Sequence, residues 1–140
     1  MRMDPRVLSR INNVVSILEQ DYAKVLQEHL TDMAKHHSVR ETAPASSRDA
    51  IHEIAHDIRC VAATFGRPLA GQIATRICTT LDRAPDGVPI IDEHLAALNH
   101  VASLTPEPEG AFAILVLKRL DELERDAPTP DQGTASSEEN

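Results

Sequence analysis

The chain has 140 residues, of which 41% are hydrophobic, and this is enough for one domain with a small core. Aromatic residues make up only 2% and tryptophan is absent, so aliphatic side chains must fill the core, which favours helices over a sheet. Because 22 acidic residues outnumber 14 basic ones, giving a net charge of −8, and no basic cluster occurs, nucleic acid is excluded as a partner.

The sequence also argues against a membrane or a disulfide-rich protein. The longest apolar run, residues 111–117, is far shorter than the ~20 residues that a membrane span requires, and residues 1–5 lack the apolar core of a signal peptide. Cys60 and Cys78 are too few for a disulfide framework or a zinc site made by cysteine alone. We therefore expect a cytoplasmic protein with reduced thiols and no membrane partner.

The first predicted helix begins at Asp4-Pro5, an N-cap followed by proline at the first helical position, and runs to about His36. Residues 38–47 contain a proline and several hydroxyl side chains without apolar periodicity, which indicates a loop. Ser46 or Ser47 is then expected to cap the second helix, which carries an apolar stripe at three- and four-residue spacing and ends near Gly66. The stripe comprises Ile51, Ile54, Ala55, Ile58, Val61, Ala62 and Phe65.

After Gly66, which suits a left-handed position, Pro68 is expected in the first turn of a third helix whose apolar residues are Leu69, Ala70, Ile73, Ala74, Ile77 and Leu81. Asp86-Gly87 breaks the chain. A fourth helix is predicted from about Pro89 to Leu104, and a fifth from Thr105 or Gly110 to Arg125. Residues 127–140 have the composition of a disordered acidic tail.

These elements predict an all-α fold over residues 1–126, namely an antiparallel four-helix bundle with a long N-terminal helix. The first helix would be about 48 Å long, whereas a helix of ordinary length spans only about 25 Å. It must therefore overhang, bend or pair elsewhere.

The second helix turns one histidine outward. On a helical wheel His56 lies opposite the centre of the apolar stripe, and Arg59, Cys60 and Ala63 lie beside it. The imidazole thus has one charged neighbour and two small ones, and such an accessible position suits a reaction with another protein.

The segment from His56 to Gly66 resembles the histidine phosphotransfer domain of bacterial phosphorelays, whose signature is His-x-x-Lys-Gly followed by small residues, a bulky apolar residue and glycine. The match continues into residues 67–74, and the rest of the chain agrees in architecture. Arg59 replaces the usual lysine and keeps its charge, whereas Cys60 replaces the usual glycine and adds a side chain on the docking face.

The resemblance implies a phosphoryl carrier rather than an enzyme, with His56 as the phosphoacceptor between aspartates of response-regulator receiver domains. Arg59 would stabilise the phosphate, with Gln72 and Arg76 as further candidates. Cys60, Ala63 and Arg67 would contact the partner. The implied partners are receiver domains and a hybrid or sensor histidine kinase. No cofactor or metal is expected on this chain, since the receiver brings Mg²⁺, and a monomer is expected.

Two alternatives stay open. The first is a zinc hydrolase, because residues 52–56 spell the zinc-protease motif His-Glu-x-x-His. One class of these proteases also needs glycine and histidine at the positions that Arg59 and Ala62 occupy here. Another class needs a carboxylate on the following helix, and Asp82 is the one carboxylate that the third helix offers. The second alternative is a helical adaptor that binds receiver or kinase domains without accepting phosphate. A kinase is excluded, because no glycine-rich nucleotide loop occurs.

Overall fold

The computed structural model describes residues 4–84, 88–89 and 91–126, and the regular elements in these ranges are all helical. The elements in chain order are α1 (Pro5–Ser38), α2 (Pro44–Val61), the 3₁₀ turn η1 (Ala62–Phe65), α3 (Pro68–Asp82), α4 (Asp92–Ser103) and α5 (Ala111–Asp126). The all-α class predicted from composition is confirmed. The expected break at Asp86-Gly87 and the expected tail 127–140 lie outside the described residues.

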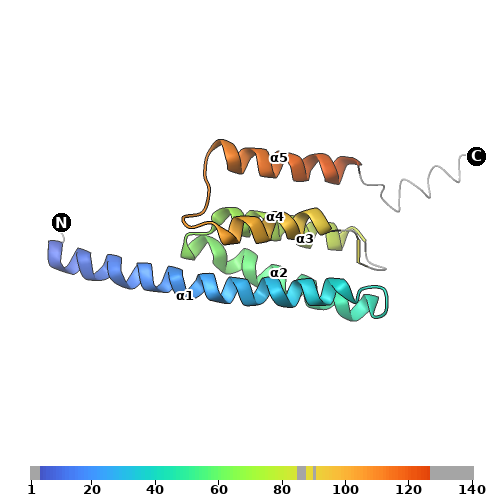
Figure 1. Ribbon diagram of the computed structural model, residues 1–140, viewed down its shortest axis with the longest axis horizontal. Helices are drawn as coiled ribbons and strands as arrows, with labels where there is room; N and C mark the ends of the chain where they lie inside the picture. The colour runs from blue at the N-terminus through green and yellow to red at the C-terminus, as the bar shows by residue number, and fades with distance from the viewer. Residues whose placement is uncertain (1–3, 85–87, 90, 127–140) are drawn as a thin grey trace, which may run out of the picture.

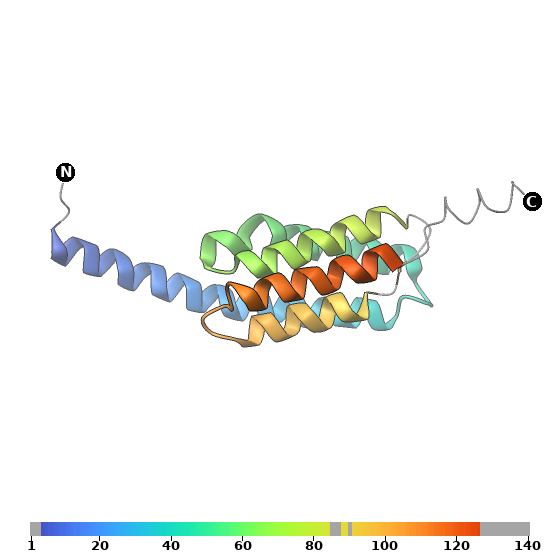
Figure 2. The same ribbon diagram turned by 90° about the horizontal axis from the view of Figure 1, so that it is seen from above.

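Helices α1 to α4 pack as a ring, because α1 and α3 each contact both α2 and α4. The fifth helix, α5, lies along α3 and α4 on the side away from α1 and α2 (Figures 1 and 2). Successive helices run in opposite directions, as the colour gradient shows (Figure 1). This arrangement is compatible with the expected four-helix bundle, to which α5 adds a further helix.

Aliphatic side chains from all five helices form one core, as the low aromatic content predicts. The stripe expected on the third helix is buried throughout, and Ile51, Ala55 and Ile58 of α2 are fully buried. Burial of each such Ile or Leu stabilises the fold by about 1.5–3 kcal/mol. Val61 was assigned to the same stripe, but it is exposed, because α2 ends there and η1 turns the backbone.

The start of α2 differs from the prediction. The helix begins at Pro44 and follows Ala43, so neither Ser46 nor Ser47 is its N-cap. Proline has a fixed φ and no N–H, and both properties suit the first helical position. Ser47 already lies inside the first turns, where its backbone N–H donates to the Ala43 carbonyl over 2.9 Å and its side chain is buried. The predicted serine cap is therefore wrong.

The turn between α2 and α3 is as tight as the sequence predicts. Gly66 has φ of +79°, in the left-handed region, and Pro68 opens α3. Phe65 of this turn stacks on Tyr22 of α1 with ring centroids 5.1 Å apart, which joins the turn to the long helix.

Two buried charged residues fasten α3 to the connection between α4 and α5. The Glu107 carboxylate accepts hydrogen bonds from the backbone N–H groups of Leu69 and Ala70, at 2.6 and 3.1 Å, and so caps the N-terminus of α3. In return, Arg67 donates to the carbonyls of Val101 and Leu104. Burial of Glu107 nevertheless raises the pKa of its carboxyl group, against the lowering effect of these two N–H groups.

The first half of α1 projects beyond the other helices in both views (Figures 1 and 2). Every residue from Pro5 to Asp21 is exposed, and the buried positions of α1 begin at Tyr22. Of the three possibilities raised by its length, the helix therefore overhangs. Among the described helices, none combines the length and the apolar character that a bilayer crossing needs.

Candidate functional site

His56 lies on the outward side of α2. The opposite side of this helix carries the buried Ile51, Ala55 and Ile58, which hold α2 against α1 and α3. The exposure of His56 inferred from the helical wheel is confirmed, and Arg59, Cys60 and Ala63 are exposed as well. The 3.6-residue period of α2 thus positions the imidazole of His56 in solvent.

Cys60 touches the imidazole of His56. Its Sγ lies 3.8 Å from both Nδ1 and Nε2, as expected for side chains four residues apart on one helix. The thiol therefore lies against the ring, on the side towards the C-terminus of α2. A molecule that approaches either ring nitrogen from that side meets the sulfur atom.

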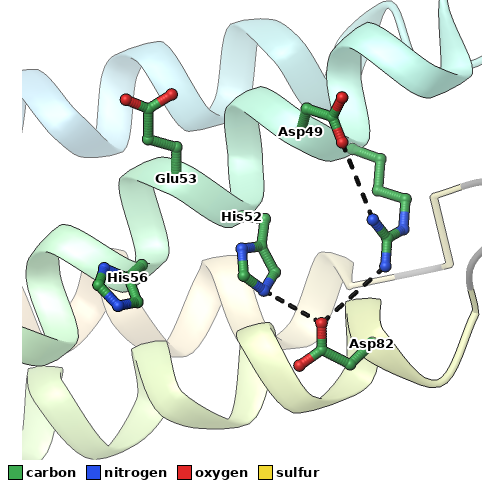
Figure 3. A pocket seen from close by; sticks show the side chains of 6 residues that line it. Asp49, His52, Glu53, His56 and Asp82 are labelled. Carbon is green, nitrogen blue, oxygen red and sulfur yellow. Dashed lines mark hydrogen bonds and ion pairs between the residues drawn. The ribbon is translucent and has the colours of Figure 1, made fainter.

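A hollow extends from His56 towards the far end of α3 (Figure 3), and its lining comprises Arg48, Asp49, His52, Glu53, His56 and Asp82. At one end His52 Nε2 lies 3.1 Å from Asp82 Oδ1, and Arg48 Nη2 lies 4.0 Å from the same oxygen. The Asp82 carboxylate thus has two basic neighbours. His56 is at the other end of the hollow, one helical turn from His52 (Figure 3).

The two histidines of the His-Glu-x-x-His motif thus share one hollow with Glu53 and Asp82. His52 already contacts Asp82 through Nε2, and Asp82 also faces Arg48. Within the residues that the structure describes, no group of three or more His, Cys, Asp or Glu side chains is arranged to hold a metal ion.

Two further residues, Gln72 and Arg76, were expected near the histidine. Gln72 is exposed on α3. Arg76 points to α5 instead, where its guanidinium pairs with Asp121 and with Glu124, the latter at 2.9 Å. Arg76 therefore anchors α5 and does not reach across to the imidazole, which corrects the role expected for it.

Arg67 was expected on the partner surface, and this placement is wrong. The residue is only 6% exposed, and its guanidinium is occupied by two backbone carbonyls and by Thr105 Oγ1. An arginine beside a glycine turn can be exposed or can bind carbonyls of a distant helix end, and the local sequence does not distinguish the two.

Sequence reasoning missed Arg48 as a neighbour of the site. Arg48, His52 and His56 follow one another at intervals of four, so they lie along one side of α2. Arg48 also donates to the carbonyls of Leu81 and Ala84 at the end of α3, at 2.7 and 3.3 Å. The four-residue spacing could have predicted that Arg48 lies on the same side of α2 as the two histidines. The contact of Arg48 with α3 is visible only in the tertiary structure.

Comparisons of this chain with protein-family models and with curated proteins found no match.

Proposed function

We propose that this chain is a histidine phosphotransfer protein, a cytoplasmic phosphoryl carrier in which His56 accepts phosphate from a receiver-domain aspartate and passes it to another. The observation that carries the proposal is the exposed imidazole on α2, beside the exposed Arg59, within the segment that resembles such domains. The ring of α1 to α4 supports it, because a four-helix bundle is the architecture that the resemblance implies.

Phosphoryl transfer requires few groups from this chain. A neutral imidazole nitrogen uses its lone pair to attack phosphorus of the receiver's acyl phosphate, an N–P bond forms, and the P–O bond to the aspartate breaks with the carboxylate as leaving group. An imidazole nitrogen with a free lone pair is itself a usable nucleophile, so this step needs no activating base. The receiver domain would supply the aspartate and its Mg²⁺.

Arg59 is suited to hold the new charge. It lies three residues after His56, nearly one helical turn further along the exposed side of α2. A guanidinium at this distance can donate hydrogen bonds to phosphate oxygens on the imidazole, and such charge-assisted bonds are about twice as strong as neutral ones.

The test is transfer of label from receiver domains phosphorylated by a small phosphodonor. We expect acid-labile label on the wild-type chain and on His52→Gln, and none on His56→Gln. His52→Gln is the matched control, because it makes the same substitution one turn away on the same helix. Normal labelling of His56→Gln would contradict the proposal, and circular dichroism would show that both variants fold.

A second candidate is a helical adaptor that binds receiver or kinase domains and does not accept phosphate. The contact of the Cys60 sulfur with both ring nitrogens of His56 favours it, because this contact restricts access to the nucleophile. The two candidates differ in one result, since an adaptor binds phosphorylated receivers and stays unlabelled.

A further inference from the structure

The projecting half of α1 carries an apolar stripe that is left exposed by the residues that the structure describes. Its large side chains Val7, Leu8, Ile11, Val14, Val15 and Leu18 are between 42% and 56% exposed. Single exposed apolar residues are ordinary on a protein surface, but a contiguous patch of this kind marks an interaction site. The stripe continues directly into Tyr22 and Leu26, which the bundle buries.

The apolar residues of this stripe repeat along the chain with the spacing that is typical of two paired helices. Leu8, Ile11, Val15 and Leu18 alternate at three and four residues, and Tyr22 and Val25 continue the series. Apolar residues at this 3.5-residue period form the seam between two long helices. A short seam can be stable here because the remainder of α1 is already folded, so the unfavourable nucleation of the helix has been overcome.

The charged residues of the projecting segment favour pairing with a second copy of the same helix that runs in the opposite direction. Arg6 and Arg10 lie in the first half of the projecting segment, and Glu19 and Asp21 lie in the second half. Arg10 and Asp21 are eleven residues apart, about three turns, so they border the same side of the stripe. An antiparallel two-fold pair brings the same side of the stripe of both copies together, so the basic half of each copy lies beside the acidic half of the other, whereas a parallel pair would gather both basic halves at one end.

The shape of the molecule agrees with this orientation. Residues 5–21 span about 25 Å. The other helices all lie at one end of the projecting segment (Figure 2). An antiparallel pair therefore places the two bundles at opposite ends of the shared segment, whereas a parallel pair would crowd both bundles at one end. With a two-fold axis beside residue 13, Leu8 of one copy faces Leu18 of the other, and Ile11 faces Val15.

We propose that residues 5–21 of α1 form an antiparallel, two-fold symmetric helix pair with the same segment of a second copy, so that the protein is a dimer through its projecting helix. This departs from the monomer expected from the sequence. Such an interface is self-complementary and closes after two copies.

The first test is the molar mass in solution, measured by sedimentation equilibrium from micromolar to hundreds of micromolar chain. We expect a dimer for the wild type and a monomer for Ile11→Glu/Val15→Glu. Ser9→Glu/Asn13→Glu is the charge-matched control on the opposite side of the helix, and it should stay dimeric. A wild type that is monomeric over the whole range would overturn the proposal, as would dissociation of the control.

The second test is the orientation, in a Cys60→Ser background that removes the exposed thiol. Oxidation of a mixture of Leu8→Cys and Leu18→Cys chains, distinguished by a mass tag, should give the 8-to-18 disulfide as the main product. Disulfides formed only between identical chains would refute the antiparallel pair.

Discussion

At position 60 a thiol stands where the domains that this chain resembles usually carry glycine. Its sulfur lies 3.8 Å from both imidazole nitrogens of His56, so a partner that reaches the histidine must also accommodate this side chain. Specificity is a difference between affinities, and a side chain that excludes some partners can set it. Under the proposed function, Cys60 therefore tunes which receivers dock.

We expect Cys60→Gly to fold but to lose a few tenths of a kcal/mol of stability, because glycine is a poorer helix former than cysteine by about that amount. Phosphoryl transfer from the cognate receiver should become slower, and transfer from other receivers should become faster. Ala50→Gly, within the same helix, controls for the loss of helix propensity. Transfer rates from several phosphorylated receivers check this, and equal rates for wild type and variant with every donor would place Cys60 outside the docking surface.

Both ends of α3 depend on distant residues. Glu107 caps its N-terminus and Arg48 binds carbonyls at its C-terminus, so side chains from other parts of the chain satisfy both ends. The turn before α3 depends instead on its own backbone. Gly66 takes a left-handed φ there, and the Glu19 carboxylate of α1 lies where a Cβ on Gly66 would project.

Gly66→Ala and Gly110→Ala form a matched pair that tests the backbone of this turn. Both glycines have positive φ, +79° and +66°, so each alanine should destabilise the fold by about 1–2 kcal/mol. A Cβ at Gly66 would also come within 3.1 Å of Glu19 Oε2, whereas one at Gly110 meets nothing within 4 Å.

Because the Glu19 carboxylate is the flexible end of a side chain, we expect it to move aside and add only a few tenths of a kcal/mol to the Gly66→Ala loss. Denaturant unfolding of both variants provides the measurement. A loss at Gly66 several times that at Gly110 would show that α1 is held rigidly against the turn.

In the whole molecule, two buried histidines lie where helices meet. His37, at the end of α1, has Nδ1 3.5 Å from Asp92 at the start of α4, and His94 of α4 has Nε2 3.6 Å from Glu124 of α5. Loss of hydration on burial lowers the pKa of both imidazoles, and this effect exceeds the opposing effect of the neighbouring carboxylates. The fold therefore favours their neutral forms.

Stability should accordingly fall as the pH drops below about 6.5, the unfolded value, because the unfolded chain then binds protons more readily than the folded one. Each histidine contributes at most about 1.4 kcal/mol per pH unit. Urea unfolding from about pH 8 to about pH 5 measures the slope, which should flatten in His37→Gln/His94→Gln and persist in the exposed His100→Gln. An unchanged slope in the double variant would assign the pH dependence to other groups.

The sequence by itself determined the features that act within a few residues. Asp4 caps α1 and Pro5 opens it, Gly66 and Pro68 separate α2 from α3, and the apolar spacing of α3 predicts its buried side correctly. The outward position of His56 follows from the same period. Capping, glycine conformation and helical periodicity are local properties, so they can be read along the chain.

Only the tertiary structure decided which distant groups meet. Arg67 reaches carbonyls 34 and 37 residues away, Arg76 pairs across 45 and 48 residues, and His52 meets Asp82 across 30. Each of these side chains lies at a position that local rules leave open to solvent. Whether such a side chain meets a distant partner depends on how whole helices pack against one another, and this packing is not a local property of the chain.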